Sequence, residues 1–266
     1  MELPIYQVDA FASKSFKGNP AAVVPLKEWL PDQVLQNIAI ENNLSETAFF
    51  IADGDNFYLR WFTPTYEIDL CGHATLAASF VILTELFPDR DEVKYKTNVA
   101  GELIVKKDNN SFTMNFPNRK GDPVNIEDIP EYVLEGIGNI RPSEAYKARD
   151  LMLVFDTEDT VKSIEPNFRL LIKYPKGIIV TAKSDSNDID FISRFFCAHD
   201  ETIPEDPVTG SAHCTLIPYW AEKLGKNNLT AYQASKRGGH LGCRLDGDRV
   251  YITGNATLYL KGTIYV

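Results

Sequence analysis

Glu46 is the first residue whose type and place in the sequence are suited to chemistry. It follows Ser45 and directly precedes the strand-like residues 47–52. A carboxylate at the edge of an apolar strand is partly removed from water, and this suits it to moving protons. An ordinary glutamate at a strand edge has the same pattern, so the residue alone leaves both roles open.

The second candidate segment is the turn around Gly72, which lies between Cys71 and His73 and precedes the almost entirely apolar residues 74–86. A helix that is apolar on all sides belongs in a core. The free N–H groups of its first turn would form a site for anions. A capping or packing role fits His73 as well as catalysis does, and Cys71 fits either an inert buried thiol or one with a lowered pKa.

The third candidate segment leads into a helix expected within residues 207–224. Asp206 and Ser211 are both suited to capping this helix, so capping alone would explain them. His213 lies one turn into the helix and can face the core. Pro218 should kink or shorten the helix, because proline lacks an N–H group and clashes with the preceding turn.

The spacing of cysteine and histidine does not suggest a metal ion, and we predict none. No pair matches the usual zinc spacing, and neighbouring positions do not easily share one ion. The pairs are Cys71 with His73, Cys197 with His199, and His213 with Cys214. The sequence also lacks a nucleophile-elbow, a Walker A or a dinucleotide-binding motif.

An internal repeat relates the second and third segments. When Gly72 is placed over Gly210, Leu76 falls on Cys214 and Leu86 on Leu224. Each copy has acidic residues upstream, a glycine at the turn, and an apolar helix flanked by short strands. The pattern predicts an α+β fold in which a curved sheet wraps around one central helix, made twice.

The remaining elements are short. Further helices are expected at residues 31–42, 131–136 and around 191–195. Strands are expected at residues 5–11, 21–24, 57–62, 93–95, 103–106, 112–116, 151–155, 170–172, 178–181, 249–253, 257–260 and 263–266. Gly18-Asn19-Pro20 reads as a turn, and the polar residues 118–125 mark the boundary between a first lobe, residues 1–118, and a second lobe, residues 119–254.

Composition limits the kinds of partner. The net charge of −10 disfavours binding to nucleic acid or to anionic membranes. Residues 1–20 have no signal-peptide pattern, and no apolar run reaches the ~20 residues that a membrane span needs. The four cysteines do not suggest a disulfide framework. We expect a cytoplasmic protein with reduced thiols that contacts neither nucleic acid nor membrane.

Taken together, these segments resemble the PhzF-like family, the phenazine-biosynthesis isomerase-like proteins. The matching motifs are DAFASKSFKGNPAAVV, NLSETAFF, RWFTPTYEIDLCGHAT, EDPVTGSAHCTL and QASKRGG. The resemblance implies a diaminopimelate epimerase-like fold, with two pseudo-symmetric lobes that are each a β-barrel-like sheet around a helix and a substrate cleft between them. It also implies a homodimer without metal or organic cofactor, and C-terminal strands, residues ~255–266, that return to the first lobe.

The resemblance also implies roles for particular residues. Glu46 matches the glutamate that moves a proton on a small unsaturated amino acid, and His73 and Asp206 match two further catalytic positions. The carboxylate of the small substrate would be held by the backbone around two turn glycines, with two serines as further contacts. These substrate-binding positions are Ser45, Gly72, Gly210 and Ser211.

Two alternatives remain open. An amino-acid racemase or epimerase would use Glu46 or Cys71 with a group in the second lobe. Related epimerases use one thiol at each turn, however, and the partner of Cys71 in the repeat is Thr209. The other alternative is a metabolite-binding or interaction protein that has kept the fold without catalysis.

Overall fold

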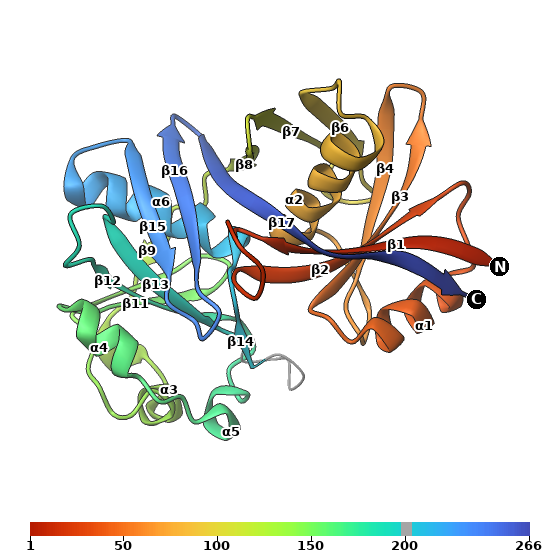
Figure 1. The fold of residues 1–266 in the computed structure, drawn as a ribbon. Coiled ribbons are helices and arrows are strands. Elements are labelled where there is room, and N and C mark those ends of the chain that lie inside the picture. The colour runs from red at the N-terminus through yellow and green to blue at the C-terminus, as the bar shows by residue number, and fades with distance from the viewer. Residues whose placement is uncertain (198–203) are drawn as a thin grey trace. The chain divides into compact units, whose positions relative to one another are not determined.

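The computed structural model describes residues 1–197 and 204–266 (Figure 1). His199, which the sequence pairs with Cys197, lies outside the described residues. The chain divides into two compact units: unit 1 comprises residues 1–115 and 252–266, and unit 2 comprises residues 116–251. The sequence places the corresponding boundaries at residues 118–119 and at about 255.

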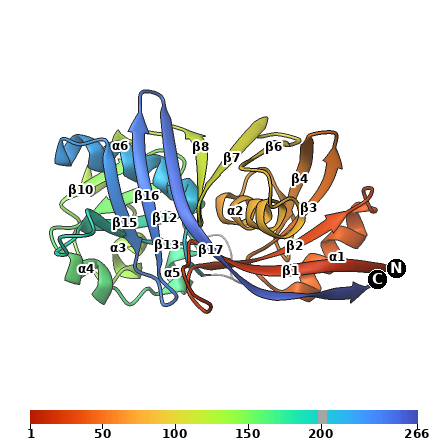
Figure 2. The same ribbon diagram turned by 45° about the horizontal axis from the view of Figure 1, so that its top comes forward.

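Unit 1 is a sheet that closes on itself around one helix, α2 (Gly72–Phe80) (Figure 2). Its strands follow one another around the ring, and the last pairs again with the first. In this order they are β17 (Arg249–Tyr265), β1 (Glu2–Ala10), β2 (Asn19–Leu26), β3 (Glu46–Asp53), β4 (Asn56–Phe62), β6 (Glu92–Lys96), β7 (Glu102–Asp108) and β8 (Ser111–Pro117). The short strand β5 (Glu67–Ile68) adds to β4.

Helix α2 has no polar face exposed to water. All its residues from Gly72 to Ser79 are buried, and it contacts β1, β2 and β3. A π-helix, η1 (Val81–Leu86), continues it, and the N–H of Phe87 donates to the carbonyl of Ile82, five residues back. The predicted apolar helix at residues 74–86 is therefore present, with a change of winding after Phe80.

The outer face of the unit 1 sheet is covered by α1 (Asp32–Asn42). Leu35 and Ile38 of this helix pack in one cluster with Val24 of β2 and Phe49 of β3. Because successive side chains of a strand point to opposite faces, β2 and β3 are buried on both sides, against α1 and against α2.

Unit 2 repeats this arrangement with strands of its own. The order of its strands is β9 (Asp122–Pro123), β10 (Glu144–Lys147), β11 (Leu151–Val154), β12 (Ile178–Lys183), β13 (Phe191–Phe196), β15 (Asn228–Gln233) and β16 (Gly239–Asp246), and β14 (Glu205–Asp206) pairs with β13. Helix α6 (Gly210–Leu224) contacts β15 and β16. The other helices are η2 (Ile126–Asp128), α3 (Glu131–Gly136), α4 (Glu158–Ser163) and α5 (Phe168–Leu171). The last three contribute to one core cluster with the sheet.

Three local predictions are wrong. Residues 191–195 form strand β13 and not a helix, and residues 170–172 fall at the end of helix α5 and not in a strand. Both segments are short apolar runs whose period does not distinguish helix from strand, so their neighbours decide. The three short strands expected at the C-terminus form one continuous strand, β17.

Pro218 lies inside α6 without ending it, so the helix is not shortened there, which was one of the two effects we expected. Proline cannot donate to the carbonyl four residues earlier, which here belongs to Cys214. That carbonyl accepts instead from the backbone N–H of Arg119, at 3.0 Å. Because a neighbouring segment supplies the missing donor, the helix runs uninterrupted to Leu224.

Candidate active site

Glu46 and His73 come together in unit 1 although they are distant in sequence. Glu46 is the first residue of β3 and His73 is the second residue of α2. The Glu46 Oε2 and His73 Nε2 atoms lie 2.9 Å apart, and the two side chains are only 15% and 5% exposed. Neither atom has another polar partner within the described part of the chain. This buried contact unites two of the three predicted catalytic residues.

Asn19 contacts the other nitrogen of the His73 ring. It is the first residue of β2, is fully buried, and places its Nδ2 atom 3.1 Å from His73 Nδ1. Ser45 Oγ donates to the side-chain Oδ1 atom of Asn19 at 3.4 Å. When Asn19 donates to Nδ1, the proton of a neutral ring must lie on Nε2, on the side of Glu46. A turned amide would instead accept from Nδ1–H of the charged ring.

The sequence predicts only a turn at Asn19. This turn is what positions the Asn19 side chain beside His73. Gly18 has φ = +64°, and a Cβ there would lie 2.0 Å from the Ala10 carbonyl oxygen. Only glycine allows this close approach without strain. Gly18 is thus the feature of the sequence that indicates a fixed position for the side chain of Asn19.

Cys71 contacts the same ring, with Sγ 3.4 Å from His73 Nδ1. Burial raises the pKa of the Cys71 thiol to about 11, and the nearby charge of Glu46 adds to the effect. Its place before a helix therefore does not give it the lowered pKa that we considered. Burial opposes protonation of His73, but the adjacent negative charge of Glu46 and the contact with Cys71 outweigh it. The pKa of His73 is consequently raised well above its usual value.

The two turn glycines of the repeat both begin a helix. Gly72 starts α2 after Cys71, and Gly210 starts α6 after Thr209; both preceding residues are extended, and neither caps its helix through its own side chain. The repeat is therefore confirmed at this point. N–H groups of each first turn are left for another acceptor.

Asp206 lies in unit 2, held close to the start of α6. Its Oδ2 atom accepts from Thr209 Oγ1 at 2.5 Å. The fully buried side chain of Gln233 contacts the same loop. Its Nε2 atom donates to the backbone carbonyl of Asp206 at 2.8 Å, and its Oε1 atom accepts from the backbone N–H of Thr209 at 2.8 Å. Gln233 is the first residue of the QASKRGG motif, but the sequence alone indicates no structural or catalytic role for it. That Asp206 acts together with Glu46 and His73 stays a prediction.

His213 differs from His73 in its surroundings. Its Nδ1 lies 2.8 Å from the Thr209 carbonyl and donates to it, while Nε2 is buried without a partner in the described structure. Burial lowers the pKa of His213 to about 4. It is therefore a neutral core residue, in agreement with a ring that faces the core.

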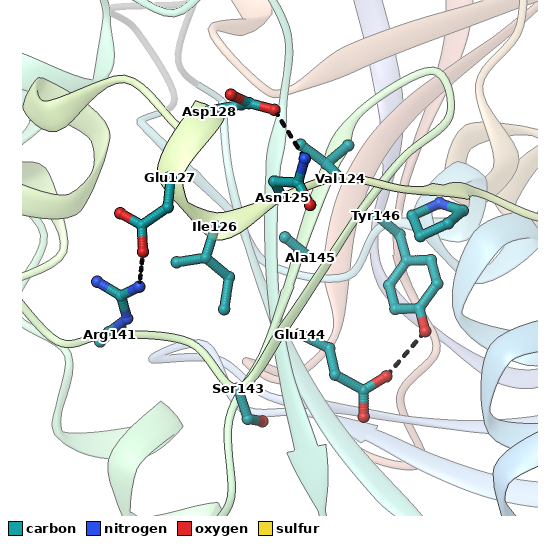
Figure 3. A pocket seen from close by; sticks show the side chains of 11 residues that line it. Val124, Asn125, Ile126, Glu127, Asp128, Arg141, Ser143, Glu144, Ala145 and Tyr146 are labelled. Carbon is teal, nitrogen blue, oxygen red and sulfur yellow. Dashed lines mark hydrogen bonds and ion pairs between the residues drawn. The ribbon is translucent and has the colours of Figure 1, made fainter.

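A surface hollow of about 510 Å³ in unit 2 contains none of these residues (Figure 3). Its charged side chains are already paired: Arg141 with Glu127, and Glu144 with the hydroxyl of Tyr146, at 2.8 Å. These pairings leave little to bind a ligand, so the chemistry is better sought at Glu46 and His73.

Comparison with known proteins agrees with this arrangement. The model of the phenazine biosynthesis-like protein family, PhzC-PhzF, matches residues 8–262. An uncharacterized isomerase of Pseudomonas aeruginosa is 46% identical over 100% of both chains. The crystal structure of a PhzF family protein from Enterococcus faecalis superposes with a TM-score of 0.94, at 46% identity and over 100% of both chains.

A more distant structure supports the fold alone. A predicted epimerase from Pseudomonas aeruginosa has a TM-score of 0.73 at 17% identity, covering 99% of both chains. The fold is therefore the diaminopimelate epimerase-like α+β fold, with a barrel-like sheet around a central helix in each lobe. No helix among residues 1–197 and 204–266 is long and apolar enough to cross a membrane. The chain belongs to the phenazine biosynthesis-like, PhzC-PhzF, family and is an enzyme of the isomerase type.

Proposed function

We propose that this chain is a cofactor-independent isomerase that moves a proton on a small carboxylate-bearing metabolite, with Glu46 as the general acid/base. The observation that carries the proposal is the buried contact of 2.9 Å between Glu46 and His73. A C–H proton is removed efficiently only by a base held in place and shielded from water. Glu46 meets both conditions, because it begins a strand and is largely buried.

His73 supports this chemistry through its charge. Its raised pKa favours the protonated ring. A positive charge beside Glu46 stabilises the negative charge that develops on a substrate when its proton leaves. Glu46 can then return the proton to another carbon of the same substrate, so a shift of a double bond needs no second base.

We assign four positions to substrate binding and Asp206 to the same reaction. N–H groups at the uncapped starts of α2 and α6 are suited to a carboxylate. Asp206 is held by contacts with Thr209 and Gln233. These contacts fix its position, as a catalytic role requires. The substrate-binding positions are Ser45, Gly72, Gly210 and Ser211. We further propose that the chain acts in the cytoplasm and as a homodimer. Light scattering of the purified protein would test the homodimer.

Deuterium uptake in D2O tests the proposal. Small amino acids and unsaturated cyclic acids would be incubated with wild type and with Glu46→Gln, and products read by mass and NMR. We expect uptake or a shifted double bond with at least one compound, and its loss in Glu46→Gln. Glu41→Gln is the matched control, since this exposed glutamate lies on α1 nearby in sequence. Exchange that survives in Glu46→Gln would overturn the role of Glu46.

The same panel separates the alternatives. Exchange at a stereocentre that is lost in Cys71→Ser and retained in Glu46→Gln would favour a one-thiol racemase or epimerase. A symmetric two-thiol reaction is disfavoured, because Cys71 and Thr209 occupy equivalent places before the two helices. Ligand binding that survives Glu46→Gln, with no exchange of any compound, would favour the binding protein.

A further inference from the structure

Glu46, Cys71 and His73 bring together three different donor types that bind metal ions. One carboxylate oxygen, one sulfur and one ring nitrogen all lie within 4.8 Å of one another. We propose that these three residues bind Zn²⁺, or a divalent ion of similar softness, and that this ion switches the enzyme off. Binding of the ion stands independently of the proposed function, whereas inhibition rests on it.

The donor atoms are gathered within 4.8 Å, and one of them must move towards the ion to complete a zinc site. Zinc bound at ~2.0–2.3 Å in a tetrahedron keeps its ligand atoms roughly 3.3–3.7 Å apart. Cys71 Sγ lies 3.4 Å from His73 Nδ1, and Glu46 Oε2 lies 2.9 Å from His73 Nε2. The ion binds one of these two ring nitrogens. The donor that contacts the other nitrogen, Cys71 or Glu46, then rotates towards the ion. The fourth position stays open for water, as in zinc sites with three protein ligands.

The set is not apparent from the sequence, because its three residues are not all neighbours along the chain. Cys71 and His73 are two residues apart and make an incomplete pair. The third donor, Glu46, comes from β3, which lies beside α2 in the closed sheet. The proposed site departs from our prediction of no metal ion, although an inhibitory ion would not be a cofactor of the reaction.

Charge and outer contacts favour a soft divalent ion. A carboxylate and a thiolate together neutralise the two charges of Zn²⁺, which matters because buried unbalanced charge is costly. Thiolate and imidazole select zinc-like ions over Mg²⁺ or Ca²⁺. Asn19 contacts the His73 ring and orients it, the role that outer residues commonly have around metal-bound histidines. On binding, the Cys71 thiol releases its proton to solvent, as does the ring if it is charged.

Inhibition follows from the residues involved. Glu46 bound to a metal ion cannot accept a proton from a substrate, and His73 bound to the ion cannot carry the positive charge that supports the reaction. Metal binding and proton transfer are thus mutually exclusive at this site.

Calorimetric titration of Zn²⁺ into metal-free protein tests the site. We expect one ion per chain in wild type and in Cys214→Ser. Cys214 is the matched control because it is also buried and helical, yet has no such set of donors in the described structure. In Cys71→Ser the affinity should fall roughly a hundredfold or more, because loss of even an outer contact costs 10–100-fold. Wild type that binds no Zn²⁺, or Cys71→Ser that binds as wild type does, would overturn the proposal.

Co²⁺ gives a readout that does not depend on the folding of a variant. Bound to wild type through Cys71, it should show a thiolate-to-metal charge-transfer absorption, which Zn²⁺ abolishes by displacement. The band must persist in Cys214→Ser; if it is absent from wild type, the thiolate is not a ligand and the proposal fails. Where exchange activity is found, Zn²⁺ should remove it and a chelator restore it. Zinc bound without any exchange activity would support the site and count against the proposed function alone.

Discussion

The two buried histidines, His73 and His213, respond to their surroundings in opposite ways. Both rings are almost completely buried, which by itself disfavours a charged ring. His73 faces Glu46, whose charge compensates the burial, whereas His213 faces only a backbone carbonyl and aromatic neighbours such as Phe191. One ring is therefore suited to carry a proton and the other to exclude it.

His213 should make the protein sensitive to acid. The pKa of His213 is about 4 in the folded protein, against a usual value of 6.5. Between these two pH values the unfolded chain binds a proton that the folded chain does not, so stability falls as the pH falls. The shift corresponds to about 3 kcal/mol, at 1.36 kcal/mol for each pKa unit. We expect His213→Leu to flatten the dependence of urea unfolding on pH over this range, and an unchanged slope would refute the assignment.

His73 should show the reverse dependence. Because its folded pKa is raised above 6.5, its stabilising contribution is present in full below that pH and is lost as the pH rises through the folded pKa. The stability difference between wild type and His73→Gln should therefore shrink on going from pH 6 to more alkaline solution. Unfolding in urea at a series of pH values measures it. A difference that grows with pH would mean that the ring is neutral and gains nothing from Glu46.

Among the elements, β14 is the one whose position depends most clearly on charge. Glu205 lies next to Asp206 and forms a two-pronged contact with Arg194 of β13, at 2.8 and 3.0 Å. The same guanidinium also donates to the carbonyls of Val161 and Ile164 at the end of α4. Arg194 thus ties the strand that bears Asp206 to a helix on the sheet.

Removing the charge of Glu205 should loosen this strand. In Glu205→Gln the largely buried Arg194 keeps its charge without its partner, and we expect a loss of about 2–3 kcal/mol in the free energy of unfolding. Asp246→Asn is the control, since its contact with Arg244 is exposed and should matter by less than about 0.5 kcal/mol. Equal effects of the two substitutions in urea unfolding would show that the buried pair has no special role.

Some kinds of element could be predicted from the sequence better than others. The two apolar helices that start at a glycine were predicted correctly. A long apolar run after a turn can be shielded from water only in the core, so its position in the fold is strongly restricted. Residues 191–195 were not, because β12 and β15 on either side, rather than local preference, make them a strand. Glu46 and His73 were identified through motifs, whereas Asn19 and Gln233 look ordinary in sequence. Their roles lie in contacts with residues 54 and 24 positions away along the chain.

Unit 1 depends on both ends of the chain. Strand β17 pairs with β1, from Glu2 opposite Tyr265 to Ala10 opposite Ala256, and also pairs with β8. It thereby joins the first and last strands of the ring, so that within unit 1 the sheet has no long free edge. Closure also keeps β2 and β3 in place around α2, and these strands begin with Asn19 and Glu46.

Truncation after Tyr251 tests this dependence. The shortened chain loses the part of β17 that pairs with β1, so the edges of β1 and β8 open and the core around α2 becomes accessible to water. We expect backbone amides of β1 and β2 to exchange with D2O as fast as in an unfolded chain, while those of β11, β12 and β13 stay protected, since their partners all lie within unit 2. Removing only residues 264–266, which contribute just the last pairs with β1, should leave protection beyond Ile5 unchanged. If β1 and β2 remained protected in the longer truncation, the other strand pairs and the helices would hold the unit 1 fold, and closure by β17 would be dispensable.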